Sequence, residues 1–156
     1  MARLSGKVVL ITGTGGGQGR EAALRFAREG AIVVGCDVDA TGHQATRALL
    51  QGEGLDLHGQ APVDLGDPEQ ARDWVDAAVA AHGRIDILYN NASAARFGPV
   101  GEFSIEDWHY TIRNELDLIF FTTKASAQTG YIYFYLMHAN AQYISHMSLY
   151  SCRALC

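Results

Sequence analysis

Residues 7–20 read Lys7-Val-Val-Leu-Ile-Thr-Gly-Thr-Gly-Gly-Gly-Gln-Gly-Arg20, and this stretch decides the fold of the chain. Residues 8–11 are apolar and β-rich, which predicts a short strand buried on both faces of a parallel sheet. Glycines follow at once, and residues 20–29 are good helix formers with apolar positions at helical spacing. A strand, a glycine turn and a helix N-terminus form a phosphate cradle, because the first N–H groups of a helix lack partners within it.

The glycine spacing is Thr12-Gly13-x-x-x-Gly17-x-Gly19, which differs from the Gly-x-Gly-x-x-Gly of the general dinucleotide fingerprint. With this spacing the chain resembles the short-chain dehydrogenase/reductase family. The resemblance implies that Thr12, Gly13, Gly17, Gln18 and Gly19 form part of a cofactor site. A flexible glycine loop between a strand and a helix is the alternative.

The second predicted strand, residues 31–37, ends on an acid that stands 18 positions after Gly19. An acid at about this distance accepts hydrogen bonds from a ribose 2′-hydroxyl and repels a 2′-phosphate. Asp37 therefore favours NAD over NADP as the cofactor. Arg20, beside the glycines, could receive a phosphate, but we expect the acid to dominate. A capping acid at the end of a strand is the alternative for Asp37.

The first 124 residues alternate strand and helix signals, which is typical of a parallel sheet covered by helices. Further strands are predicted over residues 55–63 and 85–92. Thr41 and Asp67 are expected to cap helices, Gly83 to end one, and His43 to be solvated. We therefore predict an α/β fold: a three-layer Rossmann-type, doubly wound parallel sheet. Its expected strand order is 3-2-1-4, with a place for a fifth strand beside the fourth, and the sheet is truncated after four or five strands.

Two further segments extend the family resemblance. Asn90-Asn91-Ala92-Ser93 is similar to the family's Asn-Asn-Ala-Gly signature, with serine in place of glycine. The resemblance implies that Asn90, Asn91 and Ala92 line the nucleotide pocket. Asp64 matches a family aspartate that contacts the adenine ring, although the residues alone fit a loop acid equally well.

Residues 105–123 show an apolar stripe at helical spacing and predict a long helix. The family's equivalent helix packs in the subunit interface, so the resemblance implies a homo-oligomer. Asn114 matches the catalytic asparagine of the family, which holds a water in the proton relay and kinks the helix. From the sequence alone, an exposed helical asparagine is the alternative.

The composition changes after residue 124, where the family pattern stops. Residues 125–156 contain no Asp, Glu, Pro or Lys but five of the seven tyrosines. The family's chemistry needs Tyr-x-x-x-Lys, in which lysine lowers the tyrosine pKa from about 10, and no tyrosine here has a lysine at that spacing. Residues 143–149 are either a degenerate fifth strand, with Ser145 or Ser148 near the family's serine, or part of a foreign tail, which we favour. A third interpretation makes residues 131–137 an edge strand or a short helix.

We predict an NAD(P)-binding Rossmann domain over residues 1–124 and an atypical aromatic-rich tail over residues 125–156. The resemblance implies an NAD-dependent oxidoreductase acting on a small-molecule alcohol or carbonyl, with this chain incomplete and inactive alone. The alternative is a non-catalytic dinucleotide-binding or interaction module. A net charge of −5 argues against nucleic acid, and no apolar run approaches the roughly 20 residues that span a membrane. Three cysteines without framework spacing indicate a reducing cytoplasm, and we predict no metal site.

Overall fold

The structure is a computed structural model, which describes residues 2–129 and 133–136. Strands and helices alternate along the chain as the sequence predicts. The elements in order are β1 (Val8–Thr12), α1 (Gly17–Arg28), β2 (Ile32–Cys36), α2 (Ala40–Gly52), β3 (Leu57–Gln60), α3 (Pro68–His82), β4 (Ile87–Asn90), α4 (Ile105–Ile112), the π-helical segment η1 (Arg113–Asp117), α5 (Leu118–Ala127) and β5 (Tyr133–Leu136).

The strands form one parallel sheet in the order β3-β2-β1-β4-β5, which confirms the predicted order. The fifth strand pairs with β4, with Tyr133 opposite Ile87, and it falls within the residues 131–137 considered as an edge strand or a helix. The alternative strand over residues 143–149 lies outside the described residues. Because the strand order switches beside β1, the carboxyl ends of β1 and β4 border a crevice that is the usual ligand site of such sheets.

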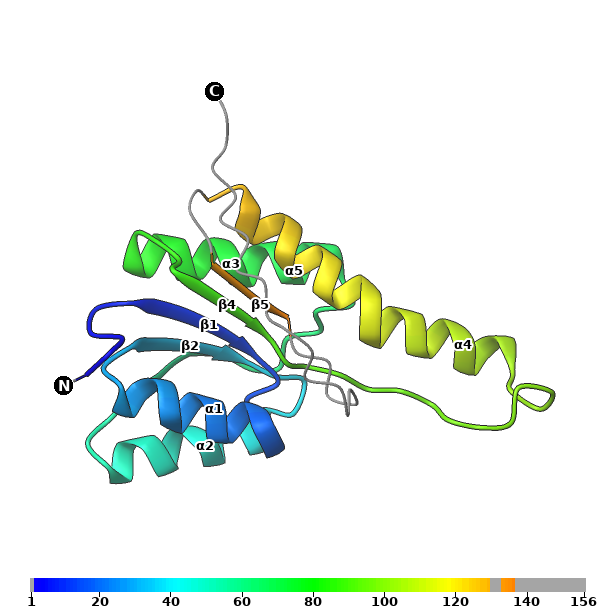
Figure 1. Ribbon diagram of the computed structural model, residues 1–156, viewed down its shortest axis with the longest axis horizontal. Coiled ribbons are helices and arrows are strands. Elements are labelled where there is room, and N and C mark those ends of the chain that lie inside the picture. Colours follow the sequence, from blue (N-terminus) through cyan, green and yellow to red (C-terminus); the bar gives the residue numbers. More distant parts are fainter. Residues whose placement is uncertain (1, 130–132, 137–156) are drawn as a thin grey trace.

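Helices cover both faces of the sheet, α1 and α2 on one side and α3 and α5 on the other (Figure 1). Successive residues of β1 serve the two faces in turn: Val8 and Leu10 pack in the core with α3 and α5, and Val9 and Ile11 pack with α1 and α2. All four are at most 2% exposed. Because both faces are buried, the strand is continuously apolar, as the sequence predicts.

The helix ends depend on short-range hydrogen bonds. The Asp67 carboxylate accepts from the N–H of Glu69 at 2.9 Å, and Gly83 ends α3 in the left-handed conformation, so both predictions are confirmed. The prediction that Thr41 caps α2 is wrong. The carboxylate of Asp39 accepts from the N–H of Thr41 at 3.0 Å, because Asp39 lies immediately before the first helical residue.

The outer strand β3 is shorter than the predicted residues 55–63, because Pro62 has no N–H for a sheet hydrogen bond. Arg47 of α2 donates to two carbonyl oxygens of this strand, that of Leu57 at 2.8 Å and that of Gly59 at 2.9 Å. The outer strand is therefore tied to a helix as well as to β2.

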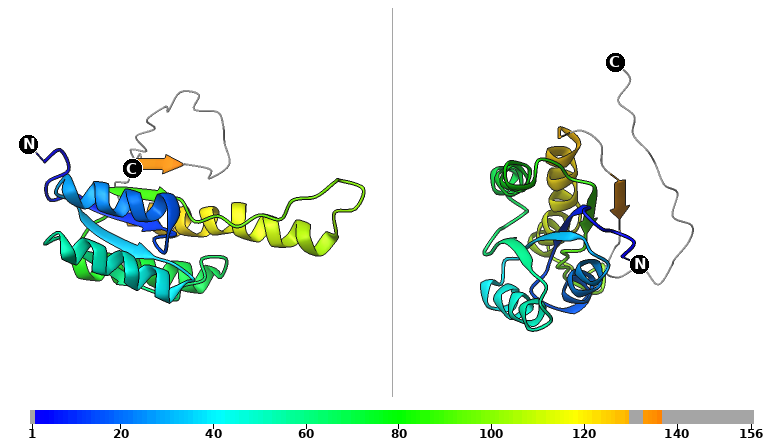
Figure 2. Two further views of the ribbon diagram at one scale, coloured as in Figure 1. Left: turned by 90° about the horizontal axis from the view of Figure 1, so that it is seen from below. Right: turned by 90° about the vertical axis from the view of Figure 1, so that its left-hand side faces the viewer.

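The helical segment from α4 through α5 runs continuously past residue 123, and α4 extends beyond the body of the sheet (Figures 1 and 2). Its predicted apolar stripe is largely unburied. Of its residues, Ile105, Trp108 and Leu116 are each more than half exposed, and so is Phe120 nearby. Among the described residues, no helix combines the length and the apolar content that crossing a bilayer requires.

A buried carboxylate fastens the start of β1 to the start of β4. Asp86 is 4% exposed, and it accepts from the N–H of Val8 at 2.9 Å, from Lys7 Nζ at 3.0 Å and from Arg84. Burial opposes ionisation of this carboxyl, but the bonds from Val8, Lys7 and Arg84 outweigh it and lower the Asp86 pKa.

We expect Asp86→Ala to lower the free energy of unfolding by about 2 kcal/mol at pH 7, because it leaves the buried N–H of Val8 without an acceptor. Lys7 and Arg84 are about half exposed, so solvent screens their ion pairs with Asp86 and these pairs add little to the free energy of unfolding. The folded pKa is lowered, so the stabilisation is complete above the unfolded pKa of about 3.9 and disappears as the pH falls through the folded value. Urea unfolding at pH 7 and in acid measures this. Asp73→Ala, at an exposed ion pair, is the control, and equal losses in the two variants would contradict the prediction.

Candidate cofactor site

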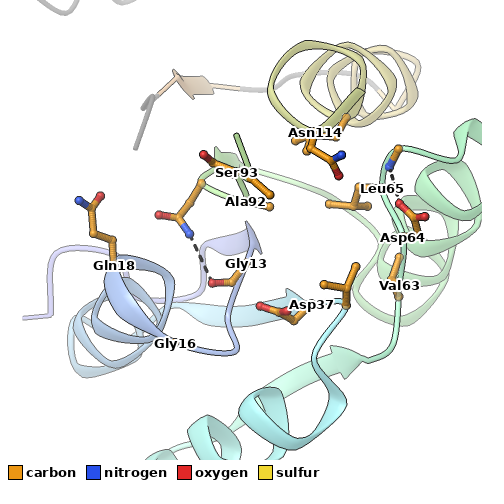
Figure 3. Close-up of a pocket in the computed structure, with 15 residues that line it drawn as sticks. Gly13, Gly16, Gln18, Asp37, Val63, Asp64, Leu65, Ala92, Ser93 and Asn114 are labelled. Carbon is orange, nitrogen blue, oxygen red and sulfur yellow. Dashed lines mark hydrogen bonds between the residues drawn. The ribbon is translucent and has the colours of Figure 1, made fainter. Parts of the chain in front are cut away.

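A cavity of about 340 Å³ opens at the carboxyl end of the sheet (Figure 3). Residues from several elements line it, including many that the sequence singles out. The predicted residues on its wall are Gly13, Gln18, Asp37, Asp64, Asn91, Ala92 and Asn114. Asn114 and Asp37 lie on opposite sides of the cavity, with Asp64 between them at one flank (Figure 3). The structure therefore brings together residues that lie far apart in the sequence, from Gly13 to Asn114.

The remaining predicted residues, Thr12, Gly17, Gly19 and Asn90, do not line this cavity. Thr12 is fully buried behind it, and its hydroxyl oxygen accepts from the N–H groups of Asn91 and Ala92, both at 2.9 Å. These bonds fix the segment after β4 against the end of β1. The position of Thr12 is thus suited to holding the wall of the cavity in place.

The two adjacent asparagines have different surroundings. Asn91 donates through Nδ2 to the carbonyl of Thr12 at 3.0 Å and also to that of Gly13 (Figure 3). Asn90 is 1% exposed, and its Oδ1 accepts from Thr122 at 2.8 Å while its Nδ2 donates to Thr123 at 3.2 Å. Successive side chains of a strand point to opposite faces, so only Asn91 reaches the cavity and Asn90 ties β4 to α5.

The glycine turn brings β1 and the start of α1 very close together. Gly13 has a positive φ of 76°, which favours glycine, and a Cβ at Gly19 would overlap the Gly13 carbonyl oxygen. Gly16 is the N-cap of α1, and no described side chain caps this helix. A Cβ at Gly16 would face open space. The uncapped N–H groups at the start of α1 fit the pyrophosphate of a dinucleotide.

Asp37 stands beside this turn. One carboxylate oxygen accepts from the N–H of Gly15 at 2.6 Å and the other from that of Asp39 at 2.8 Å. An ionised carboxylate offers about four lone-pair positions, so acceptor capacity is left for a ligand hydroxyl. Arg20, which the sequence offers as a phosphate contact, donates instead to the Gly15 carbonyl at 2.7 Å and to Thr46.

Arg113 is a cavity neighbour that the sequence does not predict. Its guanidinium donates to Asp64 at 2.7 Å, while the other Asp64 oxygen accepts from the N–H of Gly66 at 3.0 Å. The hydrogen bond to Asp64 raises the pKa of Arg113 against the opposing effect of burial, and the negative charges nearby add to it. The Asp64–Arg113 pair joins the loop after β3 to η1.

Asn114 lies in the π-helical segment η1, at the place where the family resemblance implies a kink. Its Nδ2 donates to the carbonyl of Tyr110 at 2.8 Å, and its own carbonyl accepts from the N–H of Ala94 at 3.4 Å. Ser93 donates to Glu115, the next residue of η1. Short π-helical segments within helices are frequent at functional sites.

These features define a protein of the Rossmann type: a parallel sheet with its order switching beside β1, a glycine turn into an uncapped helix, and an acid at the end of β2. A family model described as short chain dehydrogenase matches residues 7–152. The match therefore continues beyond residue 124, where we place the end of the family pattern from the sequence motifs. The chain belongs to the short-chain dehydrogenase/reductase family.

The relatives of this chain are oxidoreductases. It is 37% identical over 123 residues to D-threitol dehydrogenase of Mycolicibacterium smegmatis, covering 79% of this chain and 47% of that one. It is 35% identical over 123 residues to 3-oxoacyl-[acyl-carrier-protein] reductase of Thermotoga maritima, covering 78% and 49%. The chain thus spans about half the length of the curated relatives it matches.

Solved structures show the same fold. A short chain dehydrogenase from Mycobacterium avium superposes with a TM-score of 0.77 at 30% identity, over 82% of this chain and 47% of that one. Actinorhodin polyketide ketoreductase, solved with NADPH, superposes with a TM-score of 0.76 at 29% identity, over 83% and 49%.

Proposed function

We propose that this chain is the cofactor-binding half of an NAD-dependent oxidoreductase that acts on a small-molecule alcohol or carbonyl compound. The observation that carries the proposal is the cavity itself, which the glycine turn, Asp37, Asp64 and Asn91 line together. The relatives named as a threitol dehydrogenase and an oxoacyl reductase support the substrate class.

The pyrophosphate, the adenosine ribose and the adenine of the dinucleotide each have a matching group in or beside this cavity. The N–H groups at the start of α1 receive the pyrophosphate, Asp37 accepts from the adenosine ribose, and Asp64 contacts the adenine. The bound nicotinamide supplies the hydride chemistry. Asn114, on the opposite side from Asp37, holds a water for proton transfer, as the family resemblance implies.

The preference for NAD rests on the charge at the end of β2. Asp37 lines the cavity with its carboxylate, and a 2′-phosphate placed there would meet a negative charge. Arg20 could offset that charge, but its guanidinium is engaged by Gly15 and Thr46.

Turnover is a separate matter from binding. No tyrosine of the 156-residue sequence is followed four positions later by lysine. We therefore propose that this chain alone binds the cofactor without oxidising an alcohol or reducing a ketone, which also fits the alternative of a non-catalytic dinucleotide-binding module.

Association and compartment are further parts of the proposal. The exposed apolar residues of the segment from α4 through α5 support association with a second copy of the chain. The free, buried Cys36 suits a reducing cytoplasm.

Calorimetric titration of NADH and then NADPH into the purified chain tests the proposal. We expect saturable NADH binding, an NADPH affinity at least about tenfold lower, and no consumption of NADH with carbonyl substrates. Binding of neither cofactor by protein that unfolds cooperatively would overturn the proposal. Measurable turnover would overturn the claim of inactivity. Turnover gained by adding a C-terminal half with Tyr-x-x-x-Lys would favour the enzyme over the non-catalytic module.

A further inference from the structure

The helix α2 carries a histidine whose ring is buried against the glycine turn, so the expectation that His43 is solvated is wrong. His43 is 3% exposed, and its Nδ1 lies 2.8 Å from Oγ1 of Thr14. Thr14 is itself fully buried and directly follows Gly13, which lines the cofactor cavity. The ring therefore contacts the residue next to Gly13, which lines the proposed cofactor site.

Several other side chains form hydrogen bonds with Thr14 and with Gly15, the next residue of the turn. Thr46 donates to the Thr14 carbonyl at 2.7 Å, Asp37 accepts from the Gly15 N–H, and Arg20 donates to the Gly15 carbonyl. Among the side chains in this set, the imidazole is the one whose ordinary pKa lies near neutral pH. Of the side chains that hold the turn, His43 is thus the one that can become charged by protonation as the pH falls below neutral.

If the second ring nitrogen of His43 carried a proton, no hydrogen-bond acceptor in the described part of the chain would lie near the resulting N–H. Nε2 is buried and has no hydrogen-bond partner among the described residues. A neutral ring donates from one nitrogen only, whereas an imidazolium donates from both, so protonation in this position would leave a charged N–H unpaired. The protonated ring gains by moving toward water, which breaks its contact with Thr14.

Charged groups from three elements surround this ring. Arg47 lies one turn further along α2, Asp37 follows β2, and Arg20 of α1 approaches through its bond to Thr46. Burial, followed by repulsion from Arg47, lowers the His43 pKa, and attraction from Asp37 opposes them. The neutral ring is the form that this environment favours at neutral pH.

We propose that neutral His43 is a positioning residue that fixes the glycine turn through Thr14, and that its protonation loosens the turn and weakens dinucleotide binding. The effect on binding rests on the proposed function, whereas the effect on the turn does not. His43 itself does not line the cavity, so it acts through Thr14 and Gly13.

Titration of NAD⁺ into the full chain between pH 8 and pH 5 tests the effect on binding. For the wild type we expect Kd to rise as the pH falls toward 5, by about five- to tenfold when protonation of the ring is complete, since one buried hydrogen bond is worth about 1 kcal/mol. His43→Asn places an amide nitrogen near the position of Nδ1 and should keep the affinity seen at pH 8 without the pH dependence. His43→Leu should bind about fivefold more weakly at every pH.

The exposed His109 of α4 provides a matched control, and His109→Asn should keep the wild-type pH profile. A wild-type Kd that does not change with pH, or a folded His43→Asn that keeps the wild-type profile, would overturn the inference while leaving the proposed cofactor intact. A purely structural role for the ring would lower stability in these variants without altering the slope of Kd against pH.

Amide hydrogen exchange of the ligand-free chain tests the turn directly. At one fixed pH, His43→Leu should speed exchange at residues 13–17 about tenfold and leave β4 unchanged. If His43→Leu does not fold, wild-type exchange at several pH values within its folded range, corrected for the intrinsic pH dependence of amide exchange, gives the same comparison. Unchanged exchange in the turn would overturn the inference. Faster exchange together with no NAD⁺ binding at any pH would support the positioning role and reject the proposed function.

Discussion

Replacing Gly19 by alanine is expected to destabilise the chain by about 3 kcal/mol and to abolish NADH binding. In an exposed helix the same exchange stabilises by up to about 1 kcal/mol, so the expected sign is reversed. The reason is the packing of α1 against β1, where the added Cβ would overlap the Gly13 carbonyl oxygen and lie 2.7 Å from Asn91 Nδ2. Both neighbours belong to the wall of the cavity, so relief of the overlap displaces the proposed cofactor site.

The matched control is Gly52→Ala at the end of α2, where no described atom lies within 4 Å of the added Cβ. This variant should be neutral or slightly more stable than the wild type and should bind NADH normally. Urea unfolding and calorimetry measure the two properties for each variant. If Gly19→Ala and Gly52→Ala behaved alike, the close approach of α1 to β1 would not be a constraint on this protein.

Asp37→Asn is expected to change the ratio of NADH affinity to NADPH affinity by about a hundredfold. NADH binding should weaken about tenfold because a neutral amide is a poorer acceptor for the ribose hydroxyl. NADPH binding should strengthen about tenfold because the charge facing a 2′-phosphate is removed. The amide oxygen still accepts one of the two backbone N–H groups, so the glycine turn keeps part of its support.

Asp39→Asn serves as the control for this exchange. Asp39 caps α2 and does not line the cavity, so its loss of charge should leave the ratio unchanged. Asparagine is also a good N-cap residue, so α2 should remain intact. The same ratio in wild type and Asp37→Asn, measured by titration of both cofactors, would show that this carboxylate does not select the cofactor.

Much of the fold follows from signals that lie close together in the chain. The strand around Leu10 is recognisable because both faces of the sheet bury it, and Asp67 and Gly83 mark the ends of α3 through bonds to their own neighbours. The strand order follows from the alternation of strands and helices together with the family resemblance. Such signals do not depend on how distant segments meet.

One error is local, since the cap of α2 is Asp39 rather than Thr41, two positions later. The other differences concern contacts between distant segments. The buried ring of His43 lies 2.8 Å from the hydroxyl of Thr14, which is 29 positions earlier in the sequence. Arg113 donates to Asp64 across 49 positions. Neither pair leaves a periodic pattern in the sequence. Asn90 contacts α5 whereas Asn91 lines the cavity. This difference could have been predicted, because the side chains of a strand alternate between its two faces.

Arg47 has a consequence for the behaviour of this protein in a crowded cell. The outer strand of a sheet is a template on which another chain can add a strand, and fibres grow by repeating that step. Arg47 already engages the carbonyls of Leu57 and Gly59 and places its cationic side chain beside them. Because these carbonyls are occupied and a positive charge lies beside them, we expect Arg47 to oppose the addition of another chain at the β3 edge of the sheet.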